Sequence, residues 1–103
     1  MLRYVIHHHT GGGDAHFDLM FETTPGSALA TWRSTEWPVT ATSTVTPIAD
    51  HRLAYLDYEG PVSGNRGSVR RVAQGSHRVL RNDSVMLILE LDDGTVLTLH
   101  RAI

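Results

Sequence analysis

The chain has 103 residues, a formal net charge of −2, 41% hydrophobic residues and 19% charged residues. This size allows one domain with a modest core, and the composition excludes a disordered chain. The absence of cysteine excludes disulfides, thiolate metal sites and cysteine nucleophiles, so nitrogen and oxygen atoms must hold any metal. No apolar run approaches the roughly 18 residues of a membrane span, and the first residues lack a cleavable export pattern. We therefore expect a single cytoplasmic domain over residues 1–103 that does not associate with membranes.

All nine basic residues are arginine. Five of them lie within sixteen residues that contain no acid: Arg66, Arg70, Arg71, Arg78 and Arg81. The negative net charge argues against a general nucleic-acid coat, whose affinity comes from many phosphate contacts. Guanidinium groups nevertheless suit bidentate phosphate contacts. The run predicts either a local basic patch or a solvated strand face.

The N-terminal part predicts a β-hairpin. Residues 2–9 are rich in β-branched and aromatic side chains, residues 10–15 contain three successive glycines, and residues 15–22 alternate strictly. A period of two places Phe17, Leu19 and Phe21 on one face of the second strand, and His16, Asp18, Met20 and Glu22 on the other. The first face is expected to join the core.

The second face of this hairpin carries metal-ligating side chains. Pairing of the strands would bring His9 close to His16, and His7 close to Asp18. Cross-strand neighbours about 5 Å apart, and same-face neighbours roughly 7 Å apart, allow three such side chains to converge on one ion. The alternatives are exposed or hydrogen-bonded histidines. An expression tag is disfavoured because the three consecutive histidines sit inside a strand pattern.

Further strands are expected along the rest of the chain. We place them at residues 28–34, 68–73, 77–80, 85–91 and 95–101, separated by turn signals at 23–27, 74–76, 81–83 and 92–94. Residues 85–91 are nearly continuous in apolar content, which is typical of a central strand. Residues 37–47 predict an edge strand or an extended loop.

Residues 48–67 contain a second candidate site. His51 and Tyr55 are four residues apart and share one side of a helical turn or a strand, so they can pair a proton-transferring imidazole with a hydrogen-bonding phenol. The alternative is that His51 caps a turn and Tyr55 packs in the core. Residues 60–67 (GPVSGNRG) predict tight or left-handed turns, either presenting amides to an anion beside Arg66 or forming a long hairpin connection.

Apolar residues recur nowhere at helical spacing for ten residues or more. Eight or nine short strands with close turns predict an all-β fold, a small closed or nearly closed β-barrel of about eight strands with at most one short helical turn near residues 48–54. Closure would remove the exposed edges that so many short strands otherwise leave.

Several motifs then occur in a familiar order. His9 is followed by HFDLMFE at residues 16–22, by Trp32, by DHRLAYLDYEG at residues 50–60, and by the glycine-rich loop. The sequence resembles the 3′-phosphoesterase domain family of bacterial ligase D, the end-joining DNA repair ligase, as a stand-alone divergent member. That family has a His, then His-Tyr-Asp-Phe-Arg-Leu-Glu, a Trp, Asp-His-Pro-Leu-Asp-Tyr-Leu-Asp-Phe-Glu-Gly, and a glycine-rich loop. The likeness spans about residues 3–75.

The resemblance implies His9, His16 and Asp18 as metal ligands. It also implies that His51 and Tyr55 address the phosphate, with His51 stabilising developing charge or protonating the leaving oxygen. The metal would be manganese, with zinc or another divalent ion as alternatives. The implied substrate is a nucleic-acid 3′ end from which a terminal ribonucleoside and then a phosphate are removed, or a related phosphate ester. Separately encoded ligase and polymerase partners would act beside it.

The chain departs from the family at three basic positions, which are Met20, Glu36 and Ser43 here. Their loss removes charge-assisted contacts of about 1.5 to 3 kcal/mol each, so the phosphate cradle is reduced. Arg52 and Arg66, or Arg33, are candidates to supply substrate-binding charge from other positions.

Three functions follow from these residues. The first is a metal-dependent phosphoesterase with a reduced cradle. The second is a catalytically inactive metal-binding, nucleic-acid-binding or protein-binding descendant of the same barrel. The third takes His16 and Asp18 with a distant His51 or His100 as the facial triad of an iron oxygenase.

Overall fold

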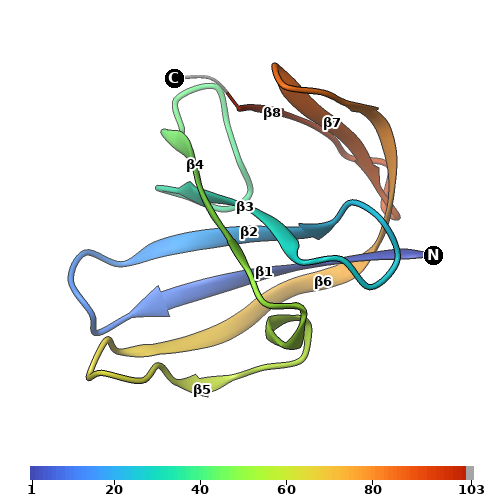
Figure 1. Cartoon of the computed structure of the whole chain (residues 1–103). Helices are drawn as coiled ribbons and strands as arrows, with labels where there is room; N and C mark the ends of the chain where they lie inside the picture. Colours follow the sequence, from blue (N-terminus) through green and yellow to red (C-terminus); the bar gives the residue numbers. More distant parts are fainter. Residues whose placement is uncertain (102–103) are drawn as a thin grey trace.

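In a computed structural model that describes residues 1–101, eight strands form a single antiparallel sheet, and the chain also contains one 3₁₀ turn (Figure 1). The elements are β1 Leu2–Thr10, β2 His16–Glu22, β3 Leu29–Ser34, β4 Val45–His51, η1 Leu53–Leu56, β5 Gly60–Pro61, β6 Ser68–Asn82, β7 Met86–Leu91 and β8 Val96–His100. The sheet order is β4-β3-β2-β1-β6-β7-β8, and β5 pairs with β6. Within residues 1–101, no helix has the length and apolar character needed to cross a membrane.

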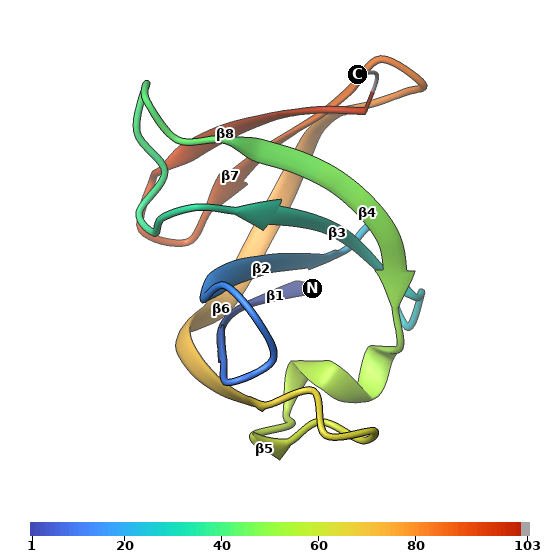
Figure 2. The ribbon, with the colours of Figure 1, turned by 90° about the vertical axis from the view of Figure 1, so that its left-hand side faces the viewer.

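The prediction of an all-β fold is confirmed, but the predicted closed or nearly closed barrel is not what forms. The sheet curls into an open half-barrel, and no backbone ladder joins β4 to β8 within the described chain (Figure 2). Side chains bridge part of this gap instead: the Trp32 indole N–H donates to the His100 carbonyl at 2.9 Å, and the Arg101 guanidinium lies 5.3 Å from the indole ring centroid. The pattern of apolar and polar residues gives no information about such a side-chain bridge. For this reason the sequence predicts closure through strand pairing instead.

The connection between β3 and β4 explains how this side of the half-barrel is covered. The sequence predicts an edge strand or an extended loop at residues 37–47; β4 begins only at Val45, and the residues before it form turns and bends. Trp37 and Val39 pack against the main core from this connection. A covering loop reduces the exposure of a sheet edge without adding a further strand.

β6 is longer than the sequence indicates. The predicted break at residues 74–76 is wrong, because β6 runs continuously through Gly75, which pairs with Tyr4. A Cβ at Gly75 would overlap the Asp92 carboxylate, which accepts a hydrogen bond from the Ser76 amide at 3.1 Å. The glycine therefore permits a close approach inside a strand rather than a turn. β6 also passes through the predicted break at Arg81 and ends at Asn82.

The alternation predicted for β2 places side chains in two separate clusters. Leu19 and Phe21 join the main core, together with Tyr4, Ile6, Ala30, Trp32, Leu87, Leu89, Leu91, Leu97 and Leu99. Met20 lies on the opposite face and is fully buried with Val5, Leu29 and Leu56. η1 thus covers part of the polar-patterned face, and the rest of that face carries the histidines and Asp18.

Candidate metal centre

The β1–β2 hairpin has the predicted register. His9 lies opposite His16, and His7 lies opposite Asp18. The two strands are joined by residues 11–15, in which Gly11 and Gly13 adopt positive φ values of 83° and 122°. Glycine reaches these angles without the steric penalty that a Cβ imposes. The glycine run is therefore the hairpin connection that the sequence predicts.

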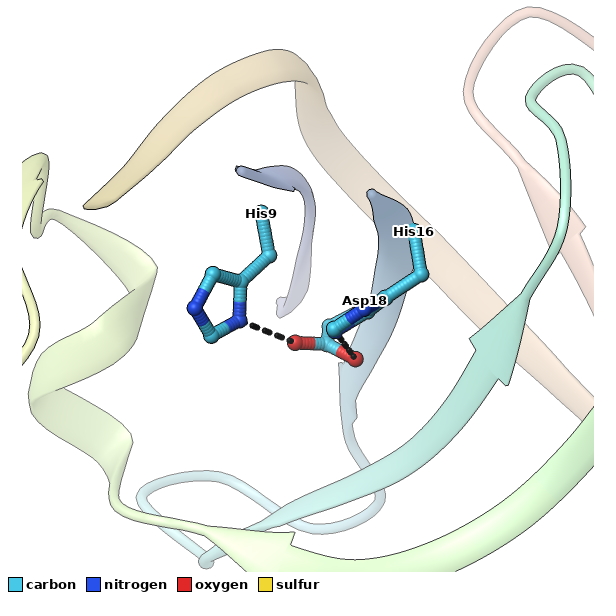
Figure 3. Close-up of side chains that lie close together, drawn as sticks. All are labelled: His9, His16 and Asp18. Carbon is cyan, nitrogen blue, oxygen red and sulfur yellow. Dashed lines mark ion pairs between the residues drawn. The ribbon is translucent and has the colours of Figure 1, made fainter. Parts of the chain in front are cut away.

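Three side chains converge at the loop end of this hairpin (Figure 3). His9 projects from β1, and His16 and Asp18 project from β2. His9 Nδ1 lies 3.8 Å from Asp18 Oδ2, and His16 Nε2 lies 3.5 Å from Asp18 Oδ1. One potential ligand atom from each residue lies within 4.8 Å of the other two. The predicted ligand residues are thus brought together.

Backbone carbonyls fix the tautomers of both imidazoles. His9 Nε2 lies 2.6 Å from the Arg66 carbonyl oxygen, and His16 Nδ1 lies 3.1 Å from the Asp14 carbonyl oxygen. A carbonyl only accepts, so these two nitrogens carry the protons. In the neutral rings, His9 Nδ1 and His16 Nε2 then have free lone pairs. In each ring, the nitrogen with the lone pair is the one that faces the Asp18 carboxylate.

Two acceptors at the centre of the cluster form no hydrogen bond. His16 Nε2 and Asp18 Oδ1 are buried and have no hydrogen-bond partner. Their 3.5 Å separation exceeds a charge-assisted hydrogen bond of about 2.7 to 2.9 Å. It matches the spacing of about 3.0 to 3.5 Å expected between neighbouring ligands on a metal with bonds of about 2.1 Å. The His9 Nδ1–Asp18 Oδ2 separation of 3.8 Å is wider, so the side chains would close slightly around a divalent cation that binds all three residues. Carbonyl-oriented imidazoles are the usual arrangement around such a cation.

Two glycines bring the neighbouring loop against the hairpin. A Cβ at Gly12 would overlap the Arg66 carbonyl, and a Cβ at Gly67 would overlap the Thr10 carbonyl. Gly67 also has a positive φ of 83°, as does Asn65 at 60°. The predicted left-handed turns of residues 60–67 therefore exist, and the close approach places the Arg66 carbonyl on His9.

Asp18 is 3% exposed, so its charge needs compensation. Arg33 lies opposite it on β3, with its Nε 3.5 Å from Asp18 Oδ1. About half of the Arg33 side chain is exposed. This arginine can therefore stabilise the carboxylate and still present guanidinium N–H groups to an anion from solvent.

His51 and Tyr55 lie close together where β4 passes into η1. Their ring centroids are 5.6 Å apart, and the His51 Nδ1 atom lies 3.1 Å from the Ala49 carbonyl oxygen. The Tyr55 ring is also 6.2 Å from the ring of His7, which pairs in register with Asp18. The predicted phosphate-addressing pair thus lies next to the strand that carries His9.

His7 connects these two groups of residues and is 1% exposed. Burial lowers its pKa below the ordinary value; the Asp18 carboxylate opposes this effect, and His51 adds to the lowering. Its Nε2 atom has no hydrogen-bond partner. His7 is therefore expected to be neutral near pH 7.

The two predicted substrate-binding arginines occupy different positions. Arg52 lies with its guanidinium carbon 5.9 Å from the Tyr55 ring centroid. The Arg66 Nε donates to the Ser63 carbonyl at 2.7 Å, so its guanidinium is held within its own loop.

The arginine-rich run is partly neutralised. Arg71, Arg78 and Arg81 form ion pairs with Glu59, Glu90 and Asp83, respectively. These pairs reduce the positive potential that the run can offer along β6.

The three positions where the resemblance would place basic residues have other contacts in the structure. Met20 is fully buried beneath η1. Ser43 donates to Glu36 Oε1 at 2.6 Å, and Thr40 donates to the same oxygen at 2.5 Å. These hydrogen bonds lower the pKa of the Glu36 carboxyl. Glu36 and Ser43 thus organise the β3–β4 connection.

From the sequence, Arg33 is one of three candidates for substrate-binding charge, and His7 has no predicted role. A signal existed for both residues, because the alternation of β3 puts Arg33 on the face of Asp18, and the hairpin register puts His7 beside it. The carbonyls of Asp14 and Arg66 leave no sequence signal, because any residue carries a carbonyl.

No family model and no curated protein matches the chain. The ligase D resemblance therefore depends on the motif residues alone.

Proposed function

We propose that this protein is a divalent-metal-dependent phosphoesterase of the ligase D type, acting on nucleic-acid 3′ ends or related phosphate esters. The observation that carries the proposal is the convergence of two imidazole lone pairs and a carboxylate, in which His16 Nε2 and Asp18 Oδ1 are buried and form no hydrogen bond. Manganese suits this nitrogen and oxygen ligand set, with zinc as the alternative. The bound cation would neutralise charge on a non-bridging phosphoryl oxygen.

His51 and Tyr55 are proposed to act on the phosphate directly. The His51 Nδ1–H group donates a hydrogen bond to the Ala49 carbonyl. In its imidazolium form, His51 would then offer the Nε2 proton to the leaving oxygen as a general acid. The Tyr55 phenol would donate a hydrogen bond to a phosphoryl oxygen.

Arg33 is proposed to replace part of the lost cradle. Its Nε lies 3.5 Å from Asp18 Oδ1, and its side chain is half exposed. An anion bound beside Asp18 would therefore meet a guanidinium without any movement of the backbone. One arginine in place of three basic residues predicts weaker phosphate binding than the full cradle would give.

The test uses purified protein, manganese and a primer strand that ends in a 3′-phosphate. We expect release of inorganic phosphate, and a loss of about 100-fold or more in His51→Ala, because general acid catalysis contributes about 10² to 10⁴. His100→Ala is the matched control, since His100 is an exposed residue of β8. Absence of phosphate release, or equal activity in His51→Ala, would contradict the proposal.

The second candidate is a non-catalytic descendant that keeps the metal and binds nucleic acid or protein. The hydrogen bond between Ser43 and Glu36 favours it, because both positions stabilise the β3–β4 connection and do not supply positive charge for a phosphate. One equivalent of bound manganese without turnover would support this function over the first. Nucleic-acid affinity that falls steeply with salt would then identify the ligand class.

A further inference from the structure

A pocket of 220 Å³ lies beside η1 and the β5 loop, separate from the three converging ligands. It is lined by Arg52, Ala54, Tyr55, Tyr58, Pro61, Val62 and Ser63. Its volume is below the roughly 300 to 1,000 Å³ of pockets that hold drug-sized ligands. The pocket is therefore sized for a single ring system.

Two tyrosines form a corner in this pocket. The rings of Tyr55 and Tyr58 are nearly perpendicular, at 82°, with centroids 5.7 Å apart. The Tyr58 hydroxyl donates to the Pro61 carbonyl, which holds its ring in place. A planar ligand stacked on one ring would meet the other edge-on, and both geometries are favourable for aromatic groups.

Arg52 gives the pocket a positive charge. No carboxylate pairs with Arg52 among residues 1–101, whereas the nearby Asp57 and Glu59 are paired with Arg3 and Arg71, respectively. The Arg52 guanidinium is 5.9 Å from the Tyr55 ring centroid. Insertion of a planar ring between them needs about 7 Å, twice a contact distance of about 3.5 Å. Because Arg52 is exposed, a small movement of its side chain would provide that space.

One loop connects the pocket to the candidate metal centre. Ser63 lines the pocket, its carbonyl accepts from Arg66 Nε at 2.7 Å, and the Arg66 carbonyl lies 2.6 Å from His9 Nε2. Tyr55 forms a second connection, since its ring lines the pocket and contacts His7 edge-on. A ligand that occupies the pocket would therefore lie beside the residues that are proposed to act on phosphate.

We propose that this pocket binds the base of the 3′-terminal nucleotide, stacked on the tyrosine corner with Arg52 over its free face. A nucleobase matches the observed chemistry because it is planar, has a π face and tolerates an apolar wall such as Pro61 and Val62. This inference deepens the proposed function and depends on it for the identity of the ligand. The base subsite gives the protein affinity for nucleotides over simple phosphate esters.

The test separates base binding from phosphate binding. We would titrate 2′-deoxyadenosine, 2′-deoxyadenosine 3′-monophosphate and inorganic phosphate into isotope-labelled protein and follow the NMR signals of Val62, Ser63 and the Tyr58 ring. Both adenine probes are expected to shift these signals, and inorganic phosphate is not. Because the base would lie between Arg52 and Tyr55 and meet Tyr58 edge-on, Tyr58→Ala should raise the Kd of 2′-deoxyadenosine by about 2- to 10-fold, the scale of an edge-to-face aromatic contact.

Three further variants separate the aromatic contact from the contribution of charge. Tyr58→Phe keeps the ring and loses only its hydrogen bond to the Pro61 carbonyl, so it should bind more tightly than Tyr58→Ala and close to the wild type. Arg52→Gln should raise the Kd by about 5-fold through loss of the cation–π contact. Arg70→Gln removes the same charge from the opposite face of the sheet, since Arg70 pairs with His8, and should change nothing.

A final variant keeps this inference distinct from the proposed function. In metal-free Asp18→Asn, 2′-deoxyadenosine should still shift the pocket signals, even though phosphoesterase activity is lost. Nucleoside binding at the pocket without any turnover in the wild type would support the subsite and contradict the enzymatic proposal. The subsite is overturned if 2′-deoxyadenosine does not shift the pocket signals, if inorganic phosphate shifts them equally, or if Tyr58→Ala binds as tightly as the wild type.

Discussion

Among residues 1–101, the buried ring nitrogens of His7, His16 and His77 have no hydrogen-bond partner, and the surroundings of His16 and His77 differ most. At the β1–β2 loop end, His16 faces Asp18 and His9. At the other end of the sheet, His77 on β6 is 7% exposed, and its Nδ1 has no partner. The His77 ring lies among the rings of Tyr4 and Phe21, with centroids 6.3 Å and 5.7 Å away.

The difference shows what makes a buried histidine a candidate ligand. His77 Nε2 lies 2.7 Å from the Glu22 carbonyl, so it too has a fixed tautomer. The carboxylate of Glu22 is, however, occupied by the backbone N–H groups of Arg3 and Gly26. Among residues 1–101, no carboxylate forms an ion pair with His77, and its Nδ1 has no hydrogen-bond partner. A fixed lone pair is common to both places, and only a converging carboxylate and second imidazole favour a cation.

The largest expected effect is on metal affinity in Asp18→Asn. The amide keeps the shape of the side chain, removes the negative charge and places a donor group among the lone pairs. We expect the affinity for manganese or zinc to fall by more than about 100-fold, because loss of an outer hydrogen-bond partner alone typically costs about 10- to 100-fold. Elemental analysis and calorimetry on protein purified without a His-tag or metal column would measure it.

Two controls sharpen this comparison. His77→Gln removes a buried imidazole far from the cluster and Asp50→Asn removes an exposed carboxylate, and both should retain wild-type affinity for the metal. Equal metal content in wild type and Asp18→Asn would show that the converging acceptors do not hold a cation.

A smaller effect is expected from Gly12→Ala. The added Cβ would overlap the Arg66 carbonyl, so the loop must shift and the hydrogen bond that fixes the His9 tautomer must lengthen. We expect metal affinity to fall by about 10-fold, the scale of an outer-shell loss. Isothermal titration of metal-free protein with manganese would measure this change.

Gly13→Ala is the matched control for this prediction. Gly13 has a positive φ of 122°, but an added Cβ would meet no atom within 4 Å. The substitution should therefore lower stability through backbone strain while leaving metal affinity close to that of the wild type. Equal losses of affinity in the two variants would assign the effect to loop strain instead.

The hairpin could be predicted because its information is local. Alternation in β2 and the glycine run fix which residues face each other, so His9, His16 and Asp18 follow from counting along two strands. The connection of His51 and Tyr55 to this hairpin could not be counted in the same way, because η1 covers the sheet through packing between distant residues. Only the resemblance related those two residues to the metal ligands.

The open edge and the long β6 strand could not be predicted for a related reason. Patterning reports which residues are apolar, and the bridge from Trp32 to the His100 carbonyl depends on where two distant strands end. Gly75 was interpreted as part of a turn because glycine commonly occurs in turns, whereas here it accommodates Asp92 from the β7–β8 turn. Both errors concern contacts between residues far apart in sequence.

The smallest expected effect is a pH dependence of stability that originates at the His77 imidazole. Burial lowers the pKa of His77 below its ordinary value, and the Glu22 carbonyl only partly opposes this. The unfolded chain therefore binds a proton at a higher pH than the folded chain does. The free energy of unfolding should be highest above about pH 6.5 and should fall as the pH decreases below it.

Urea unfolding of metal-free protein at pH 5, 6 and 7 would measure this dependence. His77→Gln keeps an N–H donor for the Glu22 carbonyl and cannot titrate, so its unfolding free energy should vary less over this range. Some dependence should remain, because burial also lowers the pKa of His7. The carboxyls whose pKa values are lowered, such as Asp83 at about 2, stay ionised throughout this window. An unchanged slope in His77→Gln would mean that the unpartnered nitrogen of His77 accepts a proton as readily in the folded core as in water.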